Sequence, residues 1–154
     1  MARLDAERRR HFPPERNHLR AHLTLFHALP GDQLEAVIAA TREAAPREPL
    51  PATVARVIKL GRGVAYGIDC PPLVALRAAI AATGFELTPQ DRNWARRPRP
   101  HVTVQNKVDP AAAATLFDEL SATFEPWPTH VVALRLWHYR GGPWDPAATI
   151  PLTK

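Results

Sequence analysis

The feature that most restricts the fold of this sequence is an internal repeat built around two histidine motifs. His22-Leu-Thr-Leu and His101-Val-Thr-Val lie 79 residues apart, and the composition predicts far fewer than one such match by chance. A helix pattern precedes each motif, and a helix, a strand and a glycine turn follow each one at closely matching distances. Self-similarity at a fixed separation indicates two copies of one supersecondary unit.

Hydropathy and turn residues give each copy the order α-β-α-β-β. In the first copy the pattern predicts helix 2–12, strand 21–29, helix 33–45, and a hairpin of strands 53–60 and 63–69. In the second copy it predicts helix 71–83, a long polar loop with Arg92, Arg96, Arg97 and Arg99, strand 101–108, helix 110–124, strand 129–140 and a last strand 144–151. The expected fold is α+β: a single bilobal domain over residues 1–154, with lobe-forming repeats at about 1–70 and 71–154 and a central cleft.

Composition sets the broad class of protein. Of the 154 residues, 45% are hydrophobic, which is enough for a packed core. The single cysteine, Cys70, excludes an intramolecular disulfide and a multi-cysteine metal site. No stretch approaches the 18 apolar residues of a membrane span, and the charged N-terminus is not a secretory signal. We therefore expect a cytoplasmic monomer whose net charge of +5, carried mainly by arginine, permits nucleic-acid partners.

The two-residue period of a strand explains the spacing within the motifs. Alternation puts two sets of side chains on shared faces: His22, Thr24 and Phe26 in the first strand, and His101, Thr103 and Gln105 in the second. The Leu and Val faces should pack on helices, which leaves the His and Thr faces to line the cleft. One imidazole can then take a proton while the other gives one, and the hydroxyls can hold a phosphoryl oxygen. This chemistry needs no metal.

Paired His-x-Thr-x motifs on a duplicated α/β scaffold resemble the 2H phosphoesterase superfamily, and most closely its 2′-5′ RNA ligase, or RNA 2′,3′-cyclic phosphodiesterase, branch. The resemblance covers nearly the whole chain and rests on residues 22–25 and 101–104, with Arg99-Pro100 ahead of the second motif. Family members usually have a further strand ahead of the first helix. This chain begins at that helix, so we expect the sheet of one lobe to be short by a strand.

The resemblance implies an enzyme, a hydrolase that opens 2′,3′-cyclic phosphate ends of RNA or nucleotides to 2′-phosphates, sometimes with 2′-5′ RNA ligase activity and with no cofactor. One histidine would deprotonate the attacking water and the other would protonate the departing 3′-oxygen. We assign His22 as the acid and His101 as the base, although the symmetry of the repeat leaves the order open. Thr24 and Thr103 would bind the non-bridging oxygens. Further substrate contacts are expected from Phe26, Arg99 and Gln105.

Two other functions stay open at this point. One is a non-catalytic RNA- or ligand-binding module, and the other is a cyclic phosphodiesterase for a small ADP-ribose-type cyclic phosphate. The basic run from Arg92 to Arg99 discriminates between an RNA substrate and a small cyclic phosphate, since a small substrate needs no phosphate track, but such a run is equally typical of a solvated loop. The Arg8-Arg9-Arg10 run predicts a solvated helix face. His27 points away from His22 and is expected to be structural.

Overall fold

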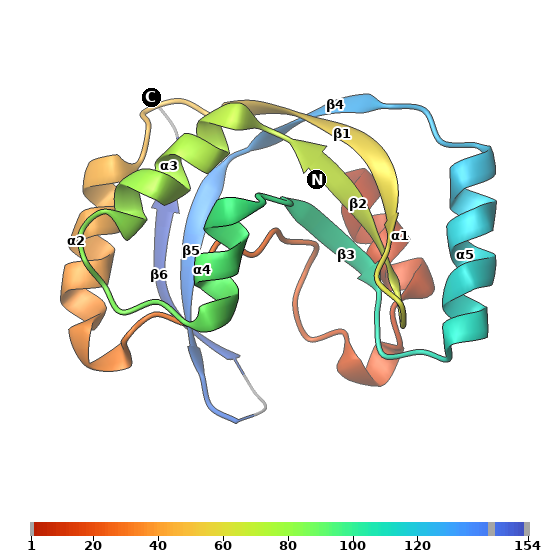
Figure 1. Cartoon of the computed structure of the whole chain (residues 1–154), viewed down its shortest axis with the longest axis horizontal. Helices are drawn as coiled ribbons and strands as arrows, with labels where there is room; N and C mark the ends of the chain where they lie inside the picture. The colour runs from red at the N-terminus through yellow and green to blue at the C-terminus, as the bar shows by residue number, and fades with distance from the viewer. Residues whose placement is uncertain (1, 142–143, 153–154) are drawn as a thin grey trace. The chain divides into compact units, whose positions relative to one another are not determined.

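Two antiparallel sheets organise the protein, which we describe from a computed structural model covering residues 2–141 and 144–152 (Figure 1). The larger sheet has the strand order β3-β2-β1-β4, and the smaller one pairs β5 with β6. The strands are β1 (Leu50–Lys59), β2 (Val64–Asp69), β3 (His101–Gln105), β4 (Trp127–Val131), β5 (Ala133–Tyr139) and β6 (Trp144–Pro151). The α-helices are α1 (Ala2–His11), α2 (Leu34–Ala44), α3 (Pro71–Ala81), α4 (Pro89–Arg96) and α5 (Pro110–Ala122). This mixture confirms the predicted α+β class.

The chain forms two compact units, each assembled from three segments. The first unit contains Met1–Thr24, Ala52–Asp69 and Arg99–Thr129, and the second contains Leu25–Pro51, Cys70–Pro98 and His130–Lys154. Each unit therefore draws on both sequence repeats. The division into repeat lobes at about residue 70 stays a prediction. No helix within the described residues is long and apolar enough to cross a membrane.

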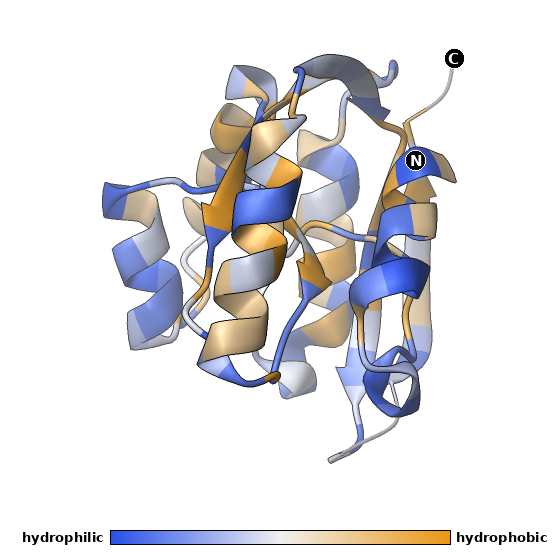
Figure 2. Ribbon diagram, turned by 90° about the vertical axis from the view of Figure 1, so that its right-hand side faces the viewer, coloured by the Kyte–Doolittle hydropathy of each residue, from blue (hydrophilic) through white to orange (hydrophobic). Residues whose placement is uncertain are grey.

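The core of the first unit forms around β2, which is buried over most of its length because it lies between β1 and β3 and is covered by helices. The predicted hairpin of β1 and β2 is confirmed, with Val57 opposite Tyr66 and Gly61 in the turn at a φ of +76°. α1 packs on β3 and α5 packs on β2. Figure 2 shows that α1, next to the N label, is hydrophilic over most of its length. The helix nevertheless buries Leu4, Asp5 and Arg8.

The second unit contains a buried charged network. α2 packs on α3 and on β6. Asp91 in α4 is fully buried and lies 3.4 Å from the guanidinium of Arg77 in α3. Asp91 also accepts hydrogen bonds from the backbone N–H groups of His27 and Ala28 and lies 3.1 Å from the His27 ring. His27 thus connects the segment after the first motif, through Asp91, to α4 and α3. This contact is structural, as the sequence led us to expect.

Three predicted elements differ from the structure. Residues 21–29 do not form a regular strand; a single bridge, Leu23 to Val102, is their only ladder contact among the described residues. The loop predicted around Arg92 contains α4, whose N-cap Thr88 accepts a hydrogen bond from the backbone of Asp91. The strand predicted over 129–140 is two strands, because β4 belongs to the larger sheet whereas β5 pairs with β6.

Candidate active site

The Leu23–Val102 bridge determines how the two motifs meet. In a regular antiparallel pair, the residue before one bridge partner lies opposite the residue after the other. From this bridge we expect His22 opposite Thr103 and Thr24 opposite His101, on one face of the pair. Val102 is buried, as a residue of the opposite face should be. All four motif residues belong to the first unit.

Both imidazoles are held by the same kind of backbone contact. His22 Nδ1 lies 2.8 Å from the carbonyl oxygen of Arg20, and His101 Nδ1 lies 2.7 Å from that of Arg99. A carbonyl oxygen can only accept, so Nδ1 must carry the proton and donate it. In the neutral ring the lone pair then resides on Nε2. Each histidine therefore has an Nε2 that can accept a proton when neutral or donate one when charged.

The surroundings of His22 act on the pKa of its ring. Protein atoms around His22 disfavour its charged form and lower its pKa from the ordinary value of 6.5; the hydrogen bond to Arg20 opposes this shift, and the nearby positive charge of Arg8 adds to it. Part of the His22 ring still reaches solvent, so the shift reflects partial burial. A lowered pKa favours the neutral form of the His22 ring, which is the form that a base needs.

Arg8 connects the backbone of the second motif to the segment before the first motif. It is only 6% exposed, although the sequence predicted that it would lie on a solvated helix face. Its Nη1 donates to the Thr103 carbonyl at 2.7 Å, and its Nε lies 3.1 Å from the Leu19 carbonyl and 2.8 Å from Asn17 Oδ1. The guanidinium also lies over the Phe12 ring, 3.9 Å from its centroid. This side chain thus ties α1 to the segment before the first motif and to the strand of the second.

Sequence reasoning missed Arg8 because three consecutive arginines usually indicate a solvated surface. A signal was nevertheless present in the spacing. Leu4, Arg8 and Phe12 follow one another at intervals of four residues, which places them on one side of a helix. Because Leu4 is buried and Phe12 packs on the guanidinium, Arg8 occupies the middle of the inward-facing stripe.

The other predicted substrate contacts occupy varied positions. Arg99 is exposed, and its carbonyl holds His101. Gln105 is buried at 9% exposure, and its Oε1 has no hydrogen-bond partner in the described structure. A register shift interrupts the alternation in β3 after Thr103, so alternation alone does not place Gln105 on the His101 face. Phe26 belongs to the second unit, where its ring lies 4.3 Å from the Arg77 guanidinium. All three substrate contacts stay predictions.

The α+β fold and the paired His-x-Thr motifs are the features expected of a 2H phosphoesterase. A family model for the 2′-5′ RNA ligase superfamily matches residues 2–143, and the chain belongs to that superfamily of enzymes that act on phosphodiester bonds. The resemblance predicted from the paired motifs is thereby confirmed. A comparison with curated protein sequences finds no match.

Solved structures with the same fold include phosphoesterases of low sequence identity. A crystal structure of a phosphoesterase is 19% identical, with a TM-score of 0.56, and the match covers 100% of this chain and 94% of that one. E. coli LigT complexed with phosphate is 20% identical, with a TM-score of 0.53 and coverage of 100% and 93%. E. coli LigT complexed with 3′-AMP is 18% identical, with a TM-score of 0.54 and coverage of 99% and 91%. At these identities the similarity shows the fold.

Proposed function

We propose that this protein hydrolyses the 2′,3′-cyclic phosphate ends of RNA or of nucleotides to 2′-phosphates by two-histidine acid–base catalysis. The observation that carries the proposal is the bridge between Leu23 and Val102, which brings the segments of the two motifs together. In a regular antiparallel pair the two His-Thr pairs would then be neighbours on one face. The matching Nδ1 contacts add that both rings offer Nε2 for proton transfer. Together these features supply the base, the acid and the oxyanion donors that opening a cyclic phosphate needs.

The proposed reaction begins with neutral His22. Its Nε2 accepts a proton from water while the water oxygen attacks phosphorus. The bond between phosphorus and the 3′-oxygen then breaks, and protonated His101 donates the Nε2 proton to that oxygen. The phosphate stays on the 2′-oxygen, and the two histidines have exchanged protonation states, which solvent resets. The hydroxyls of Thr24 and Thr103 donate hydrogen bonds to the non-bridging oxygens, on which negative charge grows in the transition state.

The order of the two roles is proposed from the environment of His22, and it reverses the order assigned from the sequence. Partial burial and the charge of Arg8 lower the pKa of His22 and so favour its neutral form. A base must be neutral before it can accept a proton, so His22 is proposed as the base in hydrolysis, and His101 is proposed as the acid.

The structural neighbours support the substrate class. E. coli LigT has been solved with phosphate and with 3′-AMP, and both molecules contain the group that the four side chains of this chain would bind. If a 5′-hydroxyl of RNA replaced the attacking water, the same proton transfers would form a 2′-5′ phosphodiester. Ligation is therefore proposed as a second outcome at the same site, in keeping with the superfamily.

The proposal is tested by incubating the purified protein with 2′,3′-cyclic nucleotides and with RNA fragments that end in a cyclic phosphate, with and without EDTA. We expect 2′-phosphate products at the same rate in both conditions, because the two imidazoles perform the proton transfers. Activity that EDTA abolishes and Zn²⁺ or Mn²⁺ restores would make His22 and His101 metal ligands instead. Tight binding without turnover would indicate a non-catalytic binding module.

A further inference from the structure

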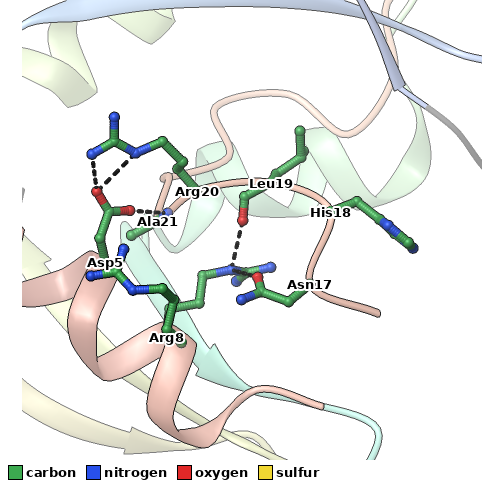
Figure 3. Close-up of a pocket in the computed structure, with 8 residues that line it drawn as sticks. Asp5, Arg8, Asn17, His18, Leu19, Arg20 and Ala21 are labelled. Atoms are coloured by element: carbon green, nitrogen blue, oxygen red, sulfur yellow. Dashed lines mark hydrogen bonds and ion pairs between the residues drawn. The ribbon is translucent and has the colours of Figure 1, made fainter. Parts of the chain in front are cut away.

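A polar pocket of the first unit is lined by residues of α1 and of the segment that precedes His22 (Figure 3). α1 and the loop before His22 enclose a pocket of about 200 Å³. Its lining residues are Asp5, Arg8, Arg9, Asn17, His18, Leu19, Arg20 and Ala21. The last two of them lead into His22, and the carbonyl of Arg20 holds the His22 ring. The pocket and the catalytic histidine thus share one continuous segment of chain.

Arg8 brings an unpaired positive charge to this pocket. The guanidinium is buried, and no carboxylate of the described residues lies within ion-pair distance of it. Its hydrogen bonds use Nε and Nη1 and go to neutral oxygens, which leaves Nη2 without a partner among the described residues. Burial lowers the pKa of Arg8 and the charge of Asp5 opposes that shift. A buried guanidinium with Nη2 still free to donate fits an anion such as phosphate, because hydrogen bonds between charged partners are the stronger ones.

The carboxylate in the pocket does not cancel this charge. Asp5 is 3% exposed and is paired with Arg20, whose Nε lies 3.0 Å from Oδ2. Its other oxygen accepts the Ala21 backbone N–H at 2.7 Å. Burial alone would raise the pKa of Asp5, but the bonds from Arg20 and Ala21 outweigh that effect and lower it. Asp5 and Arg20 therefore form a neutral pair, and the charges of Arg8 and the exposed Arg9 are left over.

We propose that this pocket binds a phosphodiester group of a single-stranded RNA chain whose cyclic phosphate end occupies the His22–His101 site. The inference rests on the proposed function and goes beyond it, because it makes an oligonucleotide, rather than a mononucleotide, the preferred substrate. Arg8 and Arg9 supply the positive charge. The Asn17 amide and the exposed His18 ring supply further polar groups on the rim.

The test measures RNA binding without catalysis. A fluorescein-labelled RNA tetranucleotide with a 3′-hydroxyl end is titrated with the protein at several KCl concentrations, for the wild type, Arg9→Ala and Arg10→Ala. Arg10 is the matched control because it has the same charge, follows Arg9 in α1, is likewise exposed, and lines a different pocket. We expect Arg9→Ala to weaken binding and to reduce the slope of log Kd against log[salt] by about 0.7, the value for one phosphate contact on a single strand.

Two further measurements are needed. One distinguishes RNA from inorganic phosphate as the ligand, and the other distinguishes failure of the pocket from failure of the proposed function. Inorganic phosphate in competition should displace the tetranucleotide only weakly, since the RNA offers several linked phosphodiester groups to Arg8 and Arg9 whereas inorganic phosphate is a single group. Hydrolysis of a 2′,3′-cyclic mononucleotide is measured in parallel, and Arg10→Ala should leave it unchanged. Equal salt slopes for Arg9→Ala and Arg10→Ala would overturn the proposal that the pocket binds an RNA phosphodiester. A tetranucleotide bound no better than inorganic phosphate would overturn it too. Absent mononucleotide hydrolysis would overturn the proposed function, and the salt slopes would still report on the pocket.

Discussion

At the scale of single residues, the strongest difference between the two motifs is the environment of His22. Partial burial and the charge of Arg8 lower its pKa below the ordinary 6.5, and the Arg20 carbonyl opposes them. If His22 is the base, the enzyme keeps a neutral base at pH values where an unperturbed histidine is charged. The acidic limb of kcat/KM for a 2′,3′-cyclic mononucleotide should therefore have its midpoint below pH 6.5. A midpoint above 6.5 would contradict the assignment.

The same shift affects folding. The unfolded chain binds a proton at His22 near pH 6.5, whereas the folded chain binds it at a lower pH. Between these two values the unfolded state carries more protons, so stability falls as the pH decreases through this window. His22→Gln, which cannot titrate, should show a smaller loss of stability between pH 7 and pH 5 than the wild type. Chemical denaturation at several pH values measures this difference, and parallel losses would exclude the effect.

Arg8 provides a way to move the pKa of His22. Arg8→Gln removes a positive charge near the ring, so the pKa of His22 should rise and the acidic limb should move to higher pH. Arg8→Lys keeps the charge but loses the planar fork, so its limb should stay near that of the wild type while its thermal stability falls. The pH profiles, with melting temperatures alongside, separate the electrostatic role from a purely structural one. If the acidic limbs of the wild type, Arg8→Gln and Arg8→Lys coincide, the charge of Arg8 does not affect the pKa of His22.

The threonines make a weaker contribution than the histidines in the proposed mechanism. Thr103→Ala should lower kcat for the cyclic mononucleotide by about 10²-fold, in the range of a lost oxyanion donor, with little change in the melting temperature. Thr103→Ser keeps the hydroxyl and should recover most of the rate. Equal activities of the Ala and Ser variants would show that the hydroxyl does not contact the phosphate.

At the scale of elements, the close approach of the β1–β2 hairpin to β3 supports the second motif. A Cβ added to Gly63 would lie 2.1 Å from the backbone oxygen of Gln105. Gly63→Ala should therefore destabilise the protein by about 1–3 kcal/mol, as overpacking does, and should disturb β3. Gly31→Ala is the control, because its Cβ would meet nothing within 4 Å. Urea denaturation of both variants tests this, and equal midpoints would contradict it.

The buried network around Asp91 makes a separate prediction for the second unit. Asp91→Asn leaves the Arg77 guanidinium buried without its counter-charge, so it should lower the free energy of unfolding by about 3–5 kcal/mol. Asp145→Asn breaks the exposed pair with Arg140 and should cost about 0–1 kcal/mol. Urea denaturation compares the two variants. Similar costs would show that the buried pair contributes no more than the exposed one.

The elements that the sequence predicted well are those whose signals are local. β2 and its partner β1 follow from a hydrophobic run on each side of a glycine turn, and α5 follows from Asp109-Pro110, where the Asp109 side chain caps the helix. The prediction of a strand over residues 21–29 was wrong. Alternating hydropathy indicates an extended segment, but it does not show how far that segment pairs with another strand, and here the pairing with β3 is one bridge. α4 was missed because its arginines were interpreted as a loop, although Thr88-Pro89 and Asp91 form a capping pattern.

At the scale of the whole molecule, the repeat of two His-x-Thr motifs was sufficient to predict the family and the α+β class. A repeat constrains the order of elements along the whole chain, whereas a single motif constrains only one segment. The bridge between Leu23 and Val102, from which we expect His22 opposite Thr103 and Thr24 opposite His101, could be found only in the structure, because residue spacing does not reveal which segments pair. The buried role of Arg8 likewise depends on contacts 95 residues apart along the chain. The expected monomer stays a prediction, which light scattering would test.

The central claim is that His22 and His101 together open a 2′,3′-cyclic phosphate. The most direct measurement follows a 2′,3′-cyclic mononucleotide by ³¹P NMR, in EDTA, with the wild type, His22→Ala, His101→Ala and the exposed control His130→Ala. We predict a single 2′-phosphate product, a loss of about 10²–10⁴-fold in each motif variant, and an unchanged rate for the control. A wild-type rate in either motif variant, or a 3′-phosphate product, would contradict the two-histidine mechanism.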